Sequence, residues 1–208
     1  MKYDMSCKVF SIVFSMMLNQ YYAKHLKDIN IKPIIKEVKK EYKAMIIRTP
    51  SLTKDNQMAG NLKGAAYFFS MAKKVPNMTP ELMDEIVLDA FSSPFMIKLH
   101  ASKKKKGTLF SEKAQNKMLK DSLRSKSSND EMDWKYDYYK GKDEIRYDIH
   151  KCGVKRLAER EGLLAYLPSM CKMDYPKYKI QGATLNRDKT LANGDEICNF
   201  HLIKDKNK

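Results

Sequence analysis

The chain has 208 residues, 43% of them apolar, which is enough for one domain with a sizeable core and excludes a disordered chain. Its four cysteines include no CxxC pair and do not resemble a secreted disulfide framework, so we expect reduced thiols in a cytoplasmic protein. The formal net charge is +15, but no RNP, zinc-finger or helix-turn-helix signature accompanies it, and we expect no specific nucleic-acid partner.

The first hundred residues have the apolar spacings of three and four that are typical of helices. We expect helices over residues 6–27, from Pro33 to Thr49, over 58–74 and from Thr79 onward. The apolar run 9–18 is shorter than the roughly 20 residues of a membrane span, so we expect a buried first helix and no membrane partner. The apolar face of this first helix should contain Val9, Ile12, Val13, Met16, Met17 and Tyr21.

About half of the net charge lies in one basic stretch. Residues 98–127 hold ten Lys or Arg residues against Glu112 and Asp121. Runs of like charge are usually solvated, so we expect a basic polar loop region over 98–130 with one short polar helix. The alternative is nonspecific binding of phosphate groups.

Beyond residue 130 the pattern becomes that of a mixed structure. Residues 134–150 alternate between polar and apolar, which predicts a half-buried strand. The segment from Gly153 to Arg160 predicts a helix that Gly162 ends.

Two further strands are expected over 177–190 and 196–203, because they flank Asn193-Gly194, a strong hairpin signal. The expected fold is therefore α+β, with an N-terminal helical layer packed with a C-terminal β-α-β-β unit that ends in an antiparallel hairpin. We expect a single domain over 1–208, in which the successive parts are a helical part (1–97), the basic polar loop region (98–130) and an α/β part (131–208) carrying the site.

The hairpin brings chemically active residues onto one face. With Asn193-Gly194 as a two-residue loop, Arg187 lies opposite Phe200 and Lys189 opposite Cys198. An inward-facing arginine needs an anion, so Arg187 is a candidate to bind a ligand carboxylate, with Cys198 roughly 7–8 Å away on the diagonal. The alternative is an internal ion pair with Asp174 or Asp148. The inward face should consist of Leu185, Arg187, Leu191, Cys198, Phe200 and Leu202.

Cys152 falls where a strand ends and a helix begins. Backbone N–H groups and the helix dipole at such a position lower the pKa of a thiol, which makes Cys152 a candidate nucleophile. His150 is placed to move protons beside it. The alternative is that Cys152 is a small buried hydrophobic residue. Cys171 precedes Asp174, which is a candidate general base, or else only a turn-forming residue.

We expect no metal and no cofactor. A zinc site made from Cys152, Cys171, Cys198 and His201 would lack a closely spaced chelating pair. On a strand, Cys198 and His201 also point to opposite faces.

Short motifs stand out in the C-terminal part: Cys152-Gly-Val-Lys155, Cys171-x-x-Asp174-Tyr175, Gly182-x-x-Leu185-x-Arg187, Thr190-Leu-Ala-x-Gly194 and Cys198-x-Phe200. Together with Tyr42-Lys-Ala44, Asn61-Leu-Lys-Gly-Ala-Ala-Tyr67 and Trp134, they resemble the 2-amino-thiazoline-4-carboxylic acid hydrolase family. The resemblance covers most of the chain.

This resemblance implies hydrolytic opening of a cyclic isothiourea, the thiazoline ring, to an N-carbamoyl-cysteine product. The partner would be a small carboxylated substrate. The alternative function is a non-enzymatic small-ligand sensor on the same scaffold. For catalysis the candidate residues are Cys152, Cys171, Asp174 and Cys198, and for substrate binding they are Arg187, His150, Thr190 and Asn199.

Overall fold

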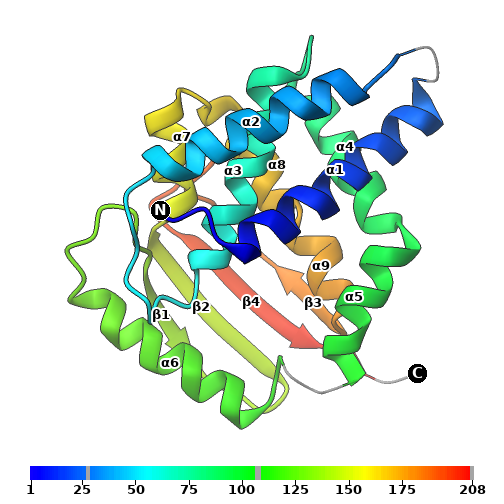
Figure 1. The fold of residues 1–208 in the computed structure, drawn as a ribbon. Helices are drawn as coiled ribbons and strands as arrows, with labels where there is room; N and C mark the ends of the chain where they lie inside the picture. Colours follow the sequence, from blue (N-terminus) through cyan, green and yellow to red (C-terminus); the bar gives the residue numbers. More distant parts are fainter. Residues whose placement is uncertain (27–28, 106–108, 207–208) are drawn as a thin grey trace.

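The computed structural model of the protein describes residues 1–26, 29–105 and 109–206 (Figure 1). The N-terminal part is helical, as predicted, and its first helices are α1 (Met5–His25), α2 (Lys32–Arg48), α3 (Ala59–Lys74) and α4 (Pro80–Ser92). Proline in the first turn begins α2 and α4, and Thr79 caps α4 by accepting a hydrogen bond from the Leu82 N–H at 3.2 Å.

The basic stretch is mostly helical, so the prediction of a loop region over 98–130 is wrong. It lies largely in α5 (Pro94–Lys105) and α6 (Glu112–Lys126), with 106–108 outside the described residues. The helix α6 packs on the sheet through Gln115, Ser122 and Ser125, which are buried. The polar helix expected in this stretch is α6, and its full length was not predicted because its inward face mixes buried polar residues with the partly buried Met118 and Leu119.

The C-terminal part contains a four-stranded antiparallel sheet, which confirms the α+β class. The strands are β1 (Lys135–Tyr139), β2 (Glu144–Lys151), β3 (Ala183–Asn186) and β4 (Cys198–Lys204), in the order β1-β2-β4-β3. The segment 134–150 is thus a hairpin rather than one strand. A Cβ atom at Gly141 would lie 2.1 Å from the Glu144 carbonyl oxygen, so only glycine fits this turn.

Between β2 and β3 the chain forms α7 (Gly153–Glu161), the 3-10 turn η1 (Leu164–Tyr166), α8 (Leu167–Lys172) and α9 (Asp174–Ile180). The helix α7 and its left-handed C-terminal Gly162 agree with the prediction. The strand predicted over 177–190 is present only as β3, because α9 extends to Ile180. Gly182, with φ of +83°, then lets the chain reverse into β3.

The final hairpin keeps its predicted register but not its predicted loop. Leu185 pairs with Leu202, and Asn186 pairs with His201, the register that a two-residue Asn193-Gly194 loop would impose. The ladder stops at Asn186, however, and residues 187–197 form a longer connection. Hydrogen bonds within the segment hold this connection in place.

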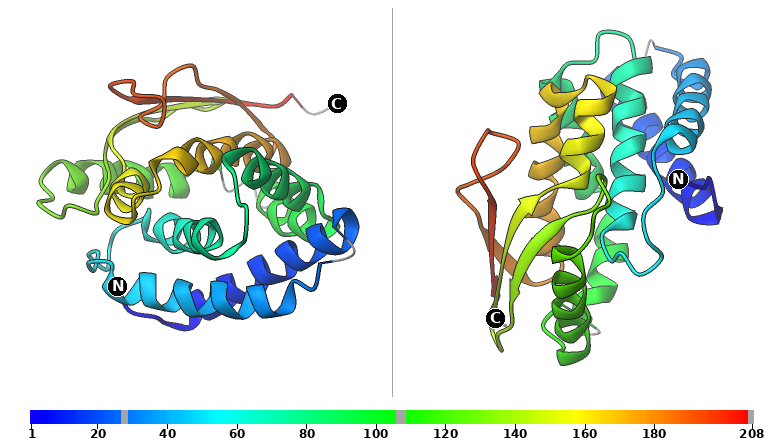
Figure 2. Two further views of the ribbon diagram at one scale, coloured as in Figure 1. Left: turned by 90° about the horizontal axis from the view of Figure 1, so that it is seen from above. Right: turned by 90° about the vertical axis from the view of Figure 1, so that its left-hand side faces the viewer.

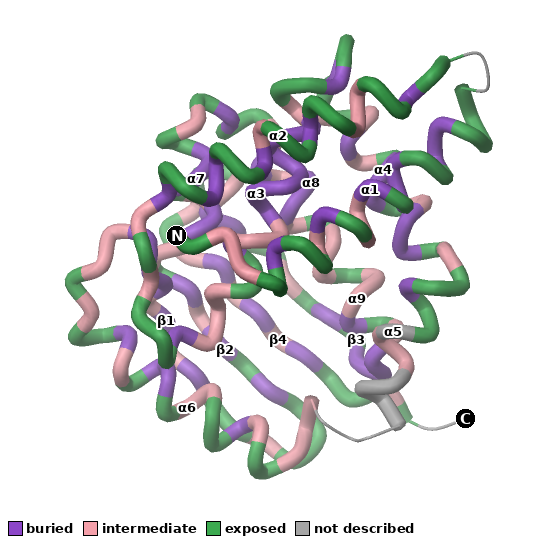
Figure 3. The backbone as a smooth tube through the Cα atoms, viewed as in Figure 1, coloured by how far each residue is buried: buried purple, intermediate pink, exposed green. Residues whose placement is uncertain are grey.

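The helices lie on one face of the sheet, and both views of Figure 2 place α1 and α2 in the layer farthest from it. The helix-facing side chains of the sheet join residues of the N-terminal helices in one hydrophobic core. Figure 3 shows the resulting alternation of buried and exposed positions along the strands. Among the described helices, none combines the length and the apolar composition needed to cross a membrane.

The helix α1 buries only part of the face predicted for it, since Met17 and Tyr21 are buried. Val9, Ile12 and Met16 are 53%, 56% and 52% exposed, whereas Ser11 and Ser15 are buried. The serines lie inward because they let α1 approach α3 closely: the Ser15 hydroxyl lies 2.7 Å from the Tyr67 hydroxyl and donates to the Ser11 carbonyl. The apolar stripe of α1 therefore faces solvent.

Candidate active site

Five of the predicted site residues lie together at one end of the sheet, where strands begin and end. Strands β2 and β3 end there and β4 begins there, because the three are antiparallel neighbours. Cys152 precedes the first residue of α7, Cys171 lies near the end of α8, Asp174 begins α9, Arg187 follows β3 and Cys198 begins β4. We call these five residues the Arg187 cluster.

Arg187 is buried and paired inside the protein. Its side chain is 2% exposed, its Nη1 donates to Asp174 Oδ2 at 3.0 Å, and its Nη2 donates to the Cys171 carbonyl oxygen at 2.7 Å. The guanidinium carbon lies 4.5 Å from the centre of the Phe200 ring and 5.1 Å from that of Tyr175. The internal pair with Asp174 is therefore present, and the pair with Asp148 is not among the described contacts.

One N–H group of Arg187 makes no hydrogen bond within the described structure. Within the described structure, Arg187 Nε is buried and has no hydrogen-bond partner. A buried charged donor without a partner is costly, so this atom is a place where a ligand acceptor would be favourable.

The three thiols of the cluster are in their protonated form at neutral pH. Burial raises the pKa of Cys152 to about 11, although the backbone N–H groups of Lys155 and Val154 oppose the shift. Burial and the neighbouring Cys152 raise the pKa of Cys171 to about 12. The pKa of Cys198 is also raised by burial, against a hydrogen bond from the Leu191 N–H to its Sγ at 3.2 Å. The prediction of a lowered pKa at Cys152 is wrong, because burial outweighs the helix N-terminus.

Two tyrosines and a lysine, none of them among the predicted site residues, complete the cluster. Lys177 Nζ lies 3.2 Å from Asp174 Oδ1. Burial alone would lower the pKa of Lys177, but Tyr178 and Asp174 raise it above its usual range, so this amine stays protonated. The hydroxyls of Tyr147 and Tyr178 lie 2.7 Å apart. The spacing of three from Asp174 to Lys177 was a usable signal only if 174–180 was recognised as a helix.

His150 and Asn199 follow inward-facing residues of β2 and β4, so their side chains lie on the other face of the sheet from Cys198. His150 Nε2 is 2.9 Å from Asp137 Oδ2, and the Asn199 amide nitrogen bonds to Asp188. The alternation of β2 and β4 puts Ile149 and Cys198 inward and the next residue of each strand outward.

Thr190 helps to shape the 187–197 connection. Its N–H donates to Asp195 Oδ2 at 2.7 Å, and its hydroxyl accepts from the Asn193 N–H at 3.2 Å. Asn199 also holds this segment, because its Oδ1 accepts from the Lys189 N–H at 2.8 Å. These contacts keep Leu191 over Cys198.

A hollow of ≈ 390 Å³ opens beside the cluster. It reaches Cys152 on one side, and Leu191 lies between it and Cys198. Its rim carries more positive than negative side chains. The lining residues are Glu131, His150, Lys151, Cys152, Lys155, Arg156, Glu159 and Leu191. Across residues 1–26, 29–105 and 109–206, no group of three His, Cys, Asp or Glu side chains is arranged to hold a metal ion.

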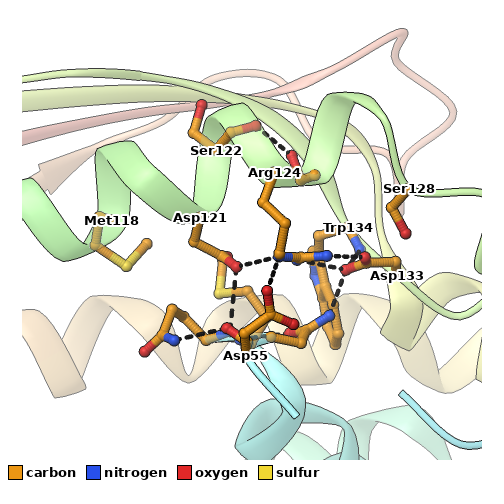
Figure 4. Close-up of polar contacts among 12 residues, drawn as sticks. Asp55, Met118, Asp121, Ser122, Arg124, Ser128, Asp133 and Trp134 are labelled. Carbon is orange, nitrogen blue, oxygen red and sulfur yellow. Dashed lines mark hydrogen bonds and ion pairs between the residues drawn. The ribbon is translucent and has the colours of Figure 1, made fainter. Parts of the chain in front are cut away.

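A second buried group of charges lies where α6 meets the start of β1 (Figure 4). Arg124 donates from Nε to Asp121 Oδ1 at 2.8 Å and from Nη1 to Asp133 Oδ2 at 2.6 Å. Nη2 also bonds to Asp133, and Asp55 approaches Nε at 3.8 Å. The side chains of Asp121 and Asp133 are 2% and 1% exposed. We call Arg124, Asp121 and Asp133 the Arg124 cluster.

The fold and the Arg187 cluster define an α+β protein with a buried site of thiols, one arginine and one carboxylate at the edge of its sheet. A comparison with family models matches residues 58–202 to the L-2-amino-thiazoline-4-carboxylic acid hydrolase family, and the chain belongs to this family. The five residues of the Arg187 cluster fall within the matched part. No curated protein and no solved structure matches the chain.

Proposed function

We propose that this protein is a hydrolase that opens the ring of a 2-amino-thiazoline-4-carboxylate, a cyclic isothiourea, to an N-carbamoyl-cysteine-like product. The observation that carries the proposal is the Arg187 cluster itself. Its three cysteines and its arginine–aspartate pair come from separate elements and lie in the stretch that the family model matches.

The reaction consumes one water molecule. Water adds to the ring carbon between nitrogen and sulfur, and the bond from that carbon to the sulfur breaks. The sulfur leaves with a proton as a thiol, and the former ring carbon becomes the carbonyl of a urea. The site must therefore bind a carboxylate, take a proton from water and give a proton to sulfur.

Arg187 and Lys177 are suited to the carboxylate. Both are positively charged, and Arg187 Nε has no partner within the described structure. A substrate carboxylate that accepts a hydrogen bond from this atom would satisfy the buried donor and gain a charge-assisted bond. Asp174 would keep the guanidinium in place through its bond to Nη1.

The raised thiol pKa values favour water over cysteine as the attacking group. A protonated thiol is a weak nucleophile, but it can give a proton to a leaving sulfur. In this route Asp174 takes the proton from water or holds the protonated ring nitrogen, while Cys152 or Cys198 protonates the sulfur. Direct attack by Cys152 or Cys198 would first require a base to remove the proton of that thiol.

The hollow beside Cys152 would be the approach for the substrate. Lys151 and Lys155 line it, and their positive charge would favour a carboxylated ligand. Arg156 adds less, because it is paired with Glu131 and Glu159.

Mass-spectrometric turnover of 2-amino-thiazoline-4-carboxylate by the purified protein tests the proposal. We expect a product one water heavier, and its loss in Cys152→Ser, Cys198→Ser and Asp174→Asn. Cys7→Ser is the matched control, since Cys7 is a buried thiol of α1 outside the matched part, and this variant should keep full turnover.

Two outcomes would contradict parts of this proposal. Full turnover in both Cys152→Ser and Cys198→Ser would remove the thiols from the chemistry and leave Asp174 with water. Saturable binding without any product would replace the hydrolase with the alternative function, a non-enzymatic small-ligand sensor.

A further inference from the structure

The outer layer formed by α1 and α2 presents an apolar stripe that nothing in the described structure covers. Met5, Val9, Ile12 and Met16 recur every three or four residues and are 70%, 53%, 56% and 52% exposed. They span roughly 16 Å of one helix face. The opposite side of the same helix is also largely apolar and packs inward, with Leu18 fully buried. The helix α1 is therefore apolar on both sides, and the described structure covers only one of them.

A ridge of lysines runs alongside this stripe. On α2, the residues Lys32, Lys36, Lys39, Lys40 and Lys43 are exposed. Of the two acidic residues of this helix, Glu37 is exposed and Glu41 is paired with Arg48 at 2.6 Å. Lys8 adds an exposed positive charge on α1.

The stripe and the ridge face the same way. Both helices lie in the layer farthest from the sheet in the two views of Figure 2, and their buried faces point to α3. On α2 the buried residues Val38, Tyr42 and Met45 lie opposite the lysines. The outer surface therefore combines an apolar band with a positive band, side by side.

We propose that this surface binds the face of a bilayer that contains anionic phospholipids. The apolar band would enter the region between headgroups and acyl chains, and the lysines would contact the negative headgroups. This differs from the expectation of no membrane partner, which rested on the length of the apolar run and on burial of the stripe. The binding is peripheral and independent of the proposed hydrolase activity.

A second copy of the chain fits this surface less well. Two copies joined through α1 would bring together two lysine ridges, in molecules that each carry a net charge of +15. An anionic surface complements the same charges. Charge complementarity therefore selects the lipid surface as the occupant.

Vesicle co-sedimentation of the full chain tests the proposal. We expect binding to vesicles of phosphatidylcholine mixed with phosphatidylserine, and much weaker binding to phosphatidylcholine alone. Ile12→Gln combined with Met16→Gln should reduce binding on the order of tenfold for each side chain, because exposed apolar groups are removed without a change in charge. Lys36→Gln combined with Lys39→Gln should reduce it about 30-fold.

Matched variants elsewhere separate this surface from the general positive charge. Leu123→Gln removes an apolar side chain of α6 that is 61% exposed, and Lys113→Gln combined with Lys117→Gln removes two exposed lysines of the same helix. Both should leave vesicle binding nearly unchanged. All substituted positions are exposed, so circular dichroism should show an unchanged fold.

Three results would overturn the proposal. One is equal loss of binding in the α6 variants and the α1–α2 variants, which would indicate nonspecific charge. Another is no binding to anionic vesicles at all. The third is a dimer in sedimentation velocity that Ile12→Gln with Met16→Gln abolishes, without any vesicle binding, which would assign the stripe to a second copy.

Discussion

The Arg124 cluster and the Arg187 cluster each contain a buried ion pair of arginine and aspartate. They differ in how many N–H groups of the arginine have a hydrogen-bond partner. Arg124 uses Nε, Nη1 and Nη2 on two buried carboxylates. Arg187 uses Nη1 and Nη2, and its buried Nε has no partner in the described structure. A buried arginine–carboxylate pair is therefore not by itself evidence of a site.

The groups around the two clusters also differ in how completely they are hydrogen-bonded. The Arg124 cluster is closed by further hydrogen bonds, from the Tyr136 hydroxyl to Asp121 at 2.8 Å and from the Trp134 N–H to Asp133 at 2.8 Å. The Arg187 cluster instead holds three protonated thiols and borders a hollow. Saturated hydrogen bonding indicates a structural role, and spare bonding capacity beside reactive groups indicates a role in binding or chemistry.

The largest expected effect is on stability at the Arg124 cluster. Arg124→Ala would leave Asp121 and Asp133 buried without their cation, which should lower the free energy of unfolding by about 3 kcal/mol. Urea unfolding measures this value. A loss below about 1 kcal/mol, the range of an exposed ion pair, would contradict the structural role.

Arg187→Ala should act mainly on function. Asp174 keeps Lys177 as a partner at 3.2 Å, so the loss of stability should be smaller than for Arg124→Ala. Turnover, by contrast, should fall about 100-fold, as for removal of one catalytic hydrogen-bond donor. Arg124→Ala is the control, since its folded fraction should keep full turnover. The reverse pattern, with Arg124→Ala impairing turnover and Arg187→Ala harmless, would reverse the assignment of the two clusters.

Much of the Arg187 cluster could be predicted from the sequence because it depends on local rules. The strand–helix junction placed Cys152, and the register of the last hairpin placed Arg187 and Cys198 on one buried face. The same alternation already separated His150 and Asn199 from that face. His150 was kept as a candidate for its position beside Cys152, and Asn199 on the resemblance to the family, although the period of two places each of them on the outer face.

The remaining features depend on packing between distant segments, which local rules do not describe. The full length of α6 and the Arg124 cluster were missed because Ser122 and Ser125 are buried against a strand that only the fold brings near. The stripe on α1 was assigned to the core because it is apolar, but it is exposed. Ser15 is buried instead, because its hydroxyl forms a hydrogen bond with the Tyr67 hydroxyl. The burial that raises the pKa of Cys152 is likewise a property of the folded structure.

Gly153, the residue after Cys152, packs closely against the residues on either side of Asp133 in the Arg124 cluster. A substitution at Gly153 therefore tests how tightly this packing holds the backbone beside Cys152. A Cβ atom at Gly153 would lie 2.2 Å from the Met132 carbonyl oxygen and 2.8 Å from the Trp134 ring. Gly153→Ala should therefore lower the free energy of unfolding by about 1–3 kcal/mol. Gly60→Ala is the matched control, because its Cβ would meet nothing within 4 Å in α3 and should stabilise the helix by roughly 0.5–1 kcal/mol. Equal urea midpoints for the two variants would contradict the predicted clash.

The smallest expected effect distinguishes the clusters by pH, since thiols occur only in the Arg187 cluster. The folded protein raises the pKa of Cys152 to about 11, whereas an unfolded thiol titrates near about 8.5. Above that value the unfolded chain loses protons that the folded chain keeps, so stability is fully present below about pH 8.5 and falls as the pH rises toward 11.

Urea unfolding between about pH 8.5 and 10, before most tyrosines titrate, measures this dependence. Cys152→Ser should remove a slope of about 1 kcal/mol per pH unit from the free energy of unfolding. Arg124→Ala should lower the whole curve with little change of its slope in this range, because it leaves the three thiols of the Arg187 cluster in place. Equal slopes for the wild type and Cys152→Ser would mean that Cys152 is already ionised in the folded protein, and the thiolate would then return as the attacking group.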